Sequence, residues 1–256
     1  MLREQTFEKL NSLKLHGMAQ AFEQQLNNPD SSELGFEDRL AMLVEAQWLW
    51  RENHAIKGRL RYAALKVQAS IENINYRHAR QLERSMIQSL ASCDWIRQHH
   101  NVVISGPSGI GKTYICCALL EKACREGFSA RYVSAPKFFR HLAIAYADGS
   151  FDRMLKKLAR TDVIAIDDWG LTPLTDMQKQ HLLEVLDDRC GSRSTVVASQ
   201  FVIDKWHDLI GSPTLADAIM ERVLSNSYRI DLKGETIRPV RKGLKPGSQS
   251  DRKEGA

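Results

Sequence analysis

A run of glycine, lysine and threonine near the middle of the chain has the spacing of a phosphate-binding loop. Gly106, Gly111, Lys112 and Thr113 occupy the fixed positions of the pattern GxxxxGK[ST]. Glycines allow a tight turn in which successive backbone N–H groups point toward phosphates. The lysine can reach the β- and γ-phosphates of a nucleotide, and the threonine hydroxyl can ligate Mg²⁺. The other residues of this predicted ATP-binding loop are Pro107, Ser108, Gly109 and Ile110.

Two adjacent acids follow a short apolar run later in the chain. Residues 163–166 are all apolar, which is typical of a buried strand, and Asp167 and Asp168 come directly after them. Open parallel sheets bind ligands at the carboxyl ends of their strands, so both acids are expected beside the phosphate loop. We predict that Asp167 and Thr113 hold Mg²⁺, partly through water, and that Asp168 polarises the attacking water. The two motifs together predict an ATPase that uses ATP and Mg²⁺.

Two further positions could complete such a site, and each has an ordinary alternative. Ser199 and Gln200 follow a predicted strand at residues 195–198 and could contact the γ-phosphate or orient the water. A serine and glutamine after a strand also form common turns. Arg222 lies on a predicted helix ahead of the last strand and could reach the ATP of a neighbouring subunit. A surface ion pair is the alternative for this arginine, and the sequence leaves both questions open.

Basic residues gather in two segments that are candidates for contact with double-stranded DNA. They are Lys57, Arg59 and Arg61 in the first segment and Arg153, Lys156 and Lys157 in the second. Contacts of this kind to DNA phosphates would be independent of base sequence and would weaken with salt. Two solvated helix faces are the alternative. The net charge of +5 and the pI near 8.9 are compatible with a nucleic-acid partner but do not establish one.

The elements that must position these residues alternate between strand and helix after residue 100. Apolar runs predict strands at residues 102–104, 130–134, 163–166, 195–198 and 228–232, with helices between them. This alternation predicts an α/β fold of the P-loop NTPase type, in which helices cover both faces of a parallel five-stranded sheet.

The residues before this alternation are expected to be almost entirely helical. Apolar residues recur there at a spacing of three to four, predicting helices at residues 2–22, 36–50 and 76–96. We therefore expect a helical N-terminal domain at residues 1–66 and an ATPase domain at residues 67–242. A polar tail at residues 243–256 is predicted to be disordered.

Composition excludes several other classes of protein. The chain is 43% hydrophobic and 26% charged, which is ordinary for a globular protein with a buried core. No apolar run is long enough to span a membrane, and the charged N-terminus does not fit a signal peptide. The five cysteines form neither a CxxC pair nor a zinc-ligand spacing, as expected of reduced thiols in the cytoplasm. We therefore expect a cytoplasmic protein without membrane contact.

Several stretches resemble the AAA+ ATPases of the initiator and helicase-loader group, and within it the IstB-like ATPases of bacterial insertion sequences. They are GPSGIGKT, VIAIDDWG, STVVASQ and ADAIMERVLSNSYRIDLKGETIR, together with the N-terminal EKLNSLKLHGMAQAFEQQL. The resemblance implies a homo-oligomer on DNA that binds ATP between subunits and recruits or activates a cognate transposase. By position it implies that Asp167 is the metal acid and Asp168 the catalytic acid. It likewise implies that Ser199 and Gln200 form the first sensor region and that Arg222 is the arginine finger.

Two departures from the AAA+ pattern bear on these expectations. Most AAA+ proteins have glutamate after the metal aspartate, whereas this chain has the shorter Asp168, so hydrolysis is expected to be slow. Residues 233–256 contain several prolines and glycines and are too short for the usual helical lid, so a neighbour or DNA must complete the pocket. A replicative helicase loader and a nucleotide-gated assembly protein that does not hydrolyse ATP remain alternatives.

Overall fold

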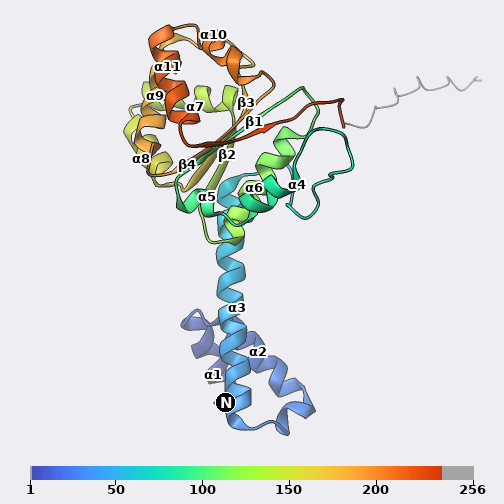
Figure 1. The fold of residues 1–256 in the computed structure, drawn as a ribbon. Helices are drawn as coiled ribbons and strands as arrows, with labels where there is room; N and C mark the ends of the chain where they lie inside the picture. The colour runs from blue at the N-terminus through green and yellow to red at the C-terminus, as the bar shows by residue number, and fades with distance from the viewer. Residues whose placement is uncertain (1, 238–256) are drawn as a thin grey trace, which may run out of the picture.

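The structure is a computed structural model that describes residues 2–237, with a small helical unit and an α/β body joined by one long helix (Figure 1). The helical unit contains α1 (Leu2–Ser12), α2 (His16–Asn27), the 3₁₀ turn η1 (Pro29–Ser32) and the first half of α3 (Phe36–Ala63). The sequence predicted that this third helix would end near residue 50. It continues to Ala63, where Ala64 adopts a left-handed conformation with φ of 49° and ends it.

The contact between α2 and α3 depends on a close backbone approach. A Cβ atom at Gly17 would lie 2.5 Å from the Ala46 carbonyl oxygen and 2.5 Å from Trp50 Cβ, so no other residue fits there. The buried Gln47 side chain accepts hydrogen bonds from the backbone N–H groups of Gly17 (3.0 Å) and Met18 (3.1 Å). The first N–H groups of a helix have no hydrogen-bond partner within that helix. Gln47 of α3 supplies an acceptor for two such N–H groups at the N-terminus of α2.

The body contains a five-stranded parallel sheet, as the sequence predicted. Its strand order, which the sequence did not predict, is β2-β3-β4-β1-β5. Its strands are β1 (Asn101–Ser105), β2 (Ala130–Ser134), β3 (Val163–Trp169), β4 (Ser194–Ser199) and β5 (Ser227–Asp231). Alternate residues of a strand face opposite sides, so Val102 and Ile104 pack into one hydrophobic core and Val103 into the other. Both faces of the sheet are therefore buried.

Two layers of helices cover these faces (Figure 1). One core is closed by α4 (Arg84–Ala91), α5 (Asp94–Arg97), α6 (Lys112–Arg125) and the end of α3. The other core is closed by α7 (Ala135–Ala147), α8 (Phe151–Arg160), α9 (Asp176–Arg189), α10 (Trp206–Ile210) and α11 (Pro213–Leu224), with the 3₁₀ turn η2 (Ile203–Lys205).

The helix predicted at residues 76–96 is wrong in its first part. The chain between α3 and α4 has no regular structure, and helix begins only at Arg84. The apolar residues of this segment pack one by one against the core, as Ile74 and Tyr76 do. Its polar groups bond to other parts of the body, since Arg80 donates to the Ile110 carbonyl (2.9 Å) and accepts from the Lys233 N–H (3.1 Å). Tertiary contacts therefore replace the helical hydrogen bonds that the periodicity suggested.

The last turns of α3 are attached to the α/β body by polar contacts. Arg59 donates to the Cys124 carbonyl (2.7 Å), and Arg131 donates to the Tyr62 carbonyl (2.7 Å). The Tyr62 hydroxyl bonds to the Thr161 hydroxyl (3.0 Å). A domain boundary at residues 66 and 67 stays a prediction. No helix follows β5 within the described residues, and the predicted tail at residues 243–256 lies outside them.

Candidate nucleotide-binding site

The predicted phosphate loop connects the end of β1 to the start of α6. A Cβ atom at Gly106, where φ is 142°, would lie 2.4 Å from the Leu232 carbonyl oxygen. A Cβ atom at Gly111, where φ is 101°, would lie 2.5 Å from Arg80 Nη1. Both glycines are therefore required by their backbone angles and by the close approach of neighbouring segments. The spacing that the sequence showed has a direct structural cause at these two positions.

The N-terminus of α6 and the Lys112 ammonium point positive charge at the loop. Lys112 is the first residue of α6, and its Nζ donates to the carbonyls of Gly106 (2.7 Å) and Pro107 (2.9 Å). The unpaired N–H groups of a helix N-terminus and its dipole both favour a bound anion. The sequence therefore placed Lys112 correctly beside the concave side of the loop.

Asp167 is fully buried at the end of β3 and accepts two hydroxyl hydrogen bonds on one oxygen. Thr113 Oγ1 donates to Asp167 Oδ2 (2.6 Å), and Tyr132 Oη donates to the same atom (2.7 Å). A hydroxyl beside a carboxylate is the oxygen-donor set that Mg²⁺ shares with nucleotide phosphates. Within residues 2–237 no cluster of three histidines, cysteines or acids could hold a metal ion.

Tyr132 is a site residue that the sequence analysis missed. It lies on β2, which pairs with β3, and its hydroxyl reaches Asp167 across that pair. Burial and the hydrogen bond to Asp167 raise the pKa of Tyr132 well above its usual range. The hydroxyl thus stays protonated and donates to the carboxylate. A lone tyrosine in a strand gives no sequence signal for this role, because the register of β2 against β3 decides it.

A β-bulge turns Asp168 toward the same side of the sheet as Asp167. The strand was predicted to end at residue 166 but continues to Trp169, with a shift in its pairing to β4 between Ile166 and Trp169. Asp168 has φ of 61° within this shift and donates its N–H to Asp167 Oδ1 (2.9 Å). Successive side chains of a regular strand would face opposite ways, so the bulge is what brings both acids together.

A cavity of about 370 Å³ adjoins the loop and the second acid. Its volume lies within the roughly 300–1,000 Å³ that is typical of small-molecule sites. Of the predicted residues, Ser108, Gly109, Gly111, Lys112, Thr113, Asp168 and Gln200 line it. Lys66 and Ile237 line it as well and were not predicted.

Ser199 does not line this cavity, although the sequence grouped it with Gln200. Its hydroxyl is buried, donates to the Trp169 carbonyl (2.9 Å) and accepts from the Phe201 N–H (3.0 Å). These two bonds fix the end of β4 to the bulged end of β3. Gln200, one residue later, is the member of the pair that faces the cavity.

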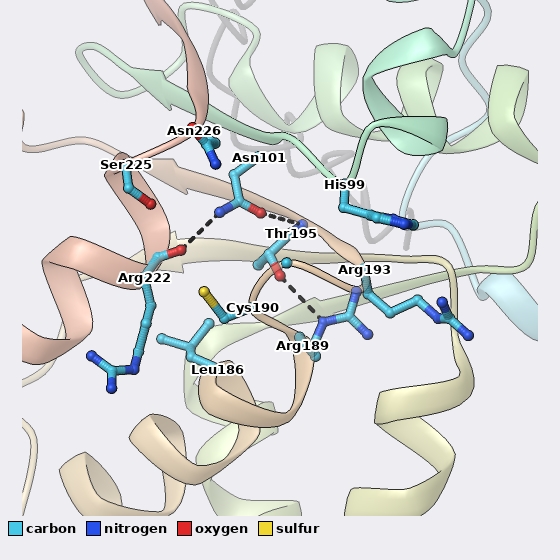
Figure 2. A pocket seen from close by; sticks show the side chains of 11 residues that line it. His99, Asn101, Leu186, Arg189, Cys190, Arg193, Thr195, Arg222, Ser225 and Asn226 are labelled. Carbon is cyan, nitrogen blue, oxygen red and sulfur yellow. Dashed lines mark hydrogen bonds between the residues drawn. The ribbon is translucent and has the colours of Figure 1, made fainter.

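Arg222 lies at the opposite edge of the sheet from the phosphate loop. Its carbonyl accepts from the side-chain amide of Asn101 (2.9 Å), the first residue of β1, whereas the loop follows the last residue of β1. Figure 2 shows the Arg222 side chain pointing away from Asn101. Its guanidinium pairs with the Asp187 carboxylate of α9. Since a five-residue strand spans about 16 Å, Arg222 cannot reach the ATP of its own subunit.

The structure brings the two predicted basic segments to neighbouring positions. Arg153, Lys156 and Lys157 are exposed on α8, opposite the buried face of that helix. Lys157 Nζ lies 5.2 Å from the ring centre of Tyr62, which follows Arg61 on α3. Lys57 and Arg61 are exposed, whereas the Nε of Arg59 is bonded to the Cys124 carbonyl. Hence α3 and α8 form one surface with several exposed cations.

Comparison with known sequences decides the family of this chain. Residues 8–244 match the sequence model of the family described as IstB-like ATP binding protein. The chain belongs to the IstB-like ATP-binding family. An insertion-sequence ATP-binding protein of Sinorhizobium fredii is 43% identical over 238 residues, which cover 93% of this chain and 97% of that protein. A similar protein of Pseudomonas fluorescens is 44% identical, over 78% of this chain and 87% of its own length.

Solved structures share the AAA+ fold with this IstB-like chain. The crystal structure of DnaI has a TM-score of 0.55 and 19% identity, covering 69% of this chain and 93% of DnaI. The DnaC helicase loader has a TM-score of 0.55 and 15% identity, covering 64% of this chain and 97% of DnaC. The resemblance of the motifs to AAA+ ATPases is thereby confirmed at the level of the fold. No helix among residues 2–237 is long and apolar enough to cross a membrane.

Proposed function

We propose that this IstB-like protein is an Mg²⁺-dependent ATPase that assembles on double-stranded DNA and assists the transposase of an insertion sequence. The observation that carries the ATPase activity is the hydrogen bond between Thr113 and the buried Asp167 directly behind the phosphate loop. The family and the names of the insertion-sequence relatives support the link to transposition. DNA, ATP and reduced thiols occur together in the cytoplasm, which is where we place this activity.

The residues around the loop account for binding and hydrolysis of ATP. Backbone N–H groups of residues 106–113 and the Lys112 ammonium bind the phosphates, and Thr113 with Asp167 would hold Mg²⁺. The ion, when bound, neutralises charge that develops on the phosphates. Asp168 accepts a proton from, or orients, the attacking water, and Gln200 lies on the same cavity to orient it. Catalysis of this kind consists mainly of positioning and charge stabilisation.

A neighbouring subunit completes the site in this proposal. Arg222 lies at the edge of the sheet opposite the loop, so a head-to-tail arrangement of subunits would place it beside the ATP of the next subunit. Its ion pair with Asp187 holds the guanidinium at the surface of the body.

The surface formed by α3 and α8 is the proposed site of contact with DNA. Exposed lysines and arginines neutralise phosphates without reading the base sequence.

A second surface, on the outer half of α3, suits a protein partner. Leu40, Val44 and Trp48 recur at a spacing of four, and their exposed fractions are 43%, 53% and 54%. An exposed apolar stripe of this kind is typical of protein–protein contact sites, and we assign it to the transposase.

The first test of the proposal is ATP turnover with and without duplex DNA. We expect phosphate release to require Mg²⁺ and to rise at least several-fold when long duplex DNA is added. Lys112→Ala, which removes the ammonium that faces the phosphates, should abolish both nucleotide binding and turnover. Unchanged nucleotide affinity in Lys112→Ala would refute this role of the lysine. No turnover in the parental protein, with DNA present and ATP bound, would favour an assembly protein that does not hydrolyse ATP.

The second test identifies the partner of the helical unit. Immobilised protein with Mg²⁺ and a non-hydrolysable ATP analogue should retain the transposase encoded with it and should not retain the replicative helicase of the same cell. Replacement of Val44 and Trp48 by serine should reduce retention, since it removes exposed apolar area without touching the core. Retention of the helicase in place of the transposase would favour a helicase loader. The DnaC helicase loader, which shares the fold, is a protein of that kind.

A further inference from the structure

Lys66 brings an ammonium group to the ATP cavity from outside the nucleotide-binding motifs. It follows the end of α3, and it lines the same cavity as Lys112, Thr113 and Gln200. Its Nζ lies 3.4 Å from Asp168 Oδ2 and 4.0 Å from Asp167 Oδ2. The two acids of the site therefore share one cation that the helical part of the chain supplies.

The backbone of Lys66 is fixed against the helix that begins with Lys112. Ala64 ends α3 in a left-handed conformation and redirects the chain along α6. The backbone groups of Lys66 and Val67 lie near the sulfur of Cys117, which is fully buried on α6. Four residues later the Ser70 carbonyl accepts from the Tyr114 hydroxyl (3.5 Å). The base of the Lys66 side chain thus has a defined position relative to the phosphate loop.

The pair of Lys66 and Asp168 contributes little to folding stability. The Lys66 side chain is 48% exposed and that of Asp168 is 35% exposed, so water screens their attraction. What the pair does provide is direction, because the ammonium holds one oxygen of Asp168 and leaves the other for a water molecule. Direction matters more for an aspartate than for the longer glutamate, because its carboxylate must be aimed from nearer the backbone.

We propose that Lys66 is a positioning residue for Asp168, and that it ties ATP hydrolysis to the packing of α3 on the ATPase body. The inference rests on the proposed function, since it assigns Lys66 a part in the same hydrolysis. Binding of DNA or transposase that displaces the end of α3 would move the Lys66 ammonium relative to Asp168. Hydrolysis then responds to what the helical unit binds.

The test compares Lys66→Met, which keeps the length of the side chain and removes its charge, with Lys66→Arg, which keeps the charge. Lys122→Met is the matched control, because Lys122 lies on α6 in an exposed ion pair with Glu126 away from the cavity. For Lys66→Met we expect kcat to fall about tenfold or more while KM changes less than about threefold, as for a group acting only on the chemical step. Lys66→Arg should recover most of kcat, and Lys122→Met should match the parental protein.

Nucleotide affinity separates positioning from direct phosphate contact. ATP binding measured in EDTA should be the same in Lys66→Met and the parental protein, since Lys66 acts through Asp168. A tenfold loss of this affinity would make Lys66 a phosphate ligand and overturn the proposal. Parental kcat in Lys66→Met would overturn it as well. Thermal unfolding checks that each variant is folded, and Lys66→Gln serves as a second neutral variant if Lys66→Met is not.

Hydrogen–deuterium exchange keeps the inference testable if the parental protein hydrolyses no ATP, an outcome that counts against the proposed function alone. A non-hydrolysable ATP analogue with Mg²⁺ should slow exchange at residues 59–69 in the parental protein and in Lys66→Arg. It should not slow exchange there in Lys66→Met, because the link from the cavity to the end of α3 is missing. Equal slowing in Lys66→Met would show that Lys66 does not make this link.

Discussion

Asp167 has its position fixed by neighbours from three separate elements. Thr113 from α6 and Tyr132 from β2 donate to one carboxylate oxygen, and the Asp168 N–H donates to the other. A buried carboxylate is costly unless hydrogen bonds satisfy it, and here they also set its direction. In the proposed Mg²⁺ site, Thr113 and Asp167 would hold the ion, and Tyr132 would keep the Asp167 carboxylate in place. Tyr132 would therefore support that site without belonging to the nucleotide motifs.

Asp168→Asn is expected to separate ATP binding from hydrolysis. The amide keeps the size of the side chain but cannot accept a proton from water, so kcat should fall about 100-fold or more, as for loss of a general base. The affinity for Mg·ATP should stay within a few-fold of the parental value, measured by titration with a fluorescent nucleotide. Asp204→Asn, at an exposed position of η2, is the matched control. Parental turnover in Asp168→Asn would reassign the catalytic acid.

At this scale the sequence predicts residues that belong to a fixed local pattern and misses those that depend on pairing. Lys112 and Thr113 lie as predicted because the loop and the helix start are continuous in the chain. Tyr132 was missed because its role needs the register of β2 against β3. The sequence grouped Ser199 with Gln200, but the bulge at Asp168 brings Trp169 under the Ser199 hydroxyl. A bulge is a single-residue change in pairing that composition does not reveal.

Among the elements, α8 shows how a helix can present charge while its other face is buried. Phe151, Leu155 and Leu158 pack into the core, and the basic residues lie on the exposed side. The buried Arg189 of α9 supports its C-terminal end by donating to the carbonyls of Leu158 and, at 2.8 Å, of Thr161. The exposed cations therefore lie on a helix with a fixed position, as a phosphate-binding surface requires.

Neutralisation of α8 should weaken DNA binding and its dependence on salt. We expect the double variant Arg153→Gln, Lys156→Gln to lose affinity for duplex DNA regardless of sequence. The slope of log affinity against log salt should become shallower by about 1.8, since each phosphate contact contributes about 0.9. Arg3→Gln, Lys9→Gln on α1 has the same change in charge and is the control. Fluorescence anisotropy over a range of salt measures both, and an unchanged slope would place the DNA elsewhere.

The elements themselves were predictable where periodicity and burial agree. All five strands were found, since each is a short apolar run between turns. The segment between α3 and α4 was not, because its apolar spacing suggested a helix. In the structure the Arg80 side chain donates to the Ile110 carbonyl of the phosphate loop, and the Arg80 carbonyl accepts from the Lys233 N–H. The length of α3 was also missed. Its second half packs on the body through Arg59 and Tyr62. These contacts are to residues far away in the chain, so the local sequence pattern does not predict them.

For the whole molecule, the important fact is that the phosphate loop and Arg222 lie on opposite edges of one sheet. The phosphate loop and the acids lie at the carboxyl edge, and Arg222 lies at the amino edge beside Asn101. In the proposed head-to-tail assembly, each subunit would supply Arg222 to the ATP site of the next. The sequence left open whether Arg222 is a finger or a surface ion-pair residue. The structure contains the ion pair with Asp187, and the role of Arg222 as a finger stays a prediction.

Arg222→Ala should therefore spare the folded monomer and reduce turnover only in the assembly. An exposed ion pair contributes about 0–1 kcal/mol, so the free energy of unfolding should change little. ATP affinity of the dilute monomer should be unchanged, whereas kcat on duplex DNA should fall at least about 100-fold, in keeping with loss of an arginine finger. Arg193→Ala, which removes another arginine near the same edge, is the control.

Mixing two inactive variants tests whether the arginine acts between subunits. Lys112→Ala subunits bind no ATP but carry Arg222, and Arg222→Ala subunits bind ATP but lack the arginine. On duplex DNA each variant alone should be inactive, and a mixture should regain turnover wherever an Arg222→Ala subunit receives the arginine of a Lys112→Ala neighbour. Co-sedimentation with DNA shows that both variants assemble. If they assemble together and the mixture stays inactive, Arg222 does not serve a neighbouring site, and its ion pair with Asp187 is its main role.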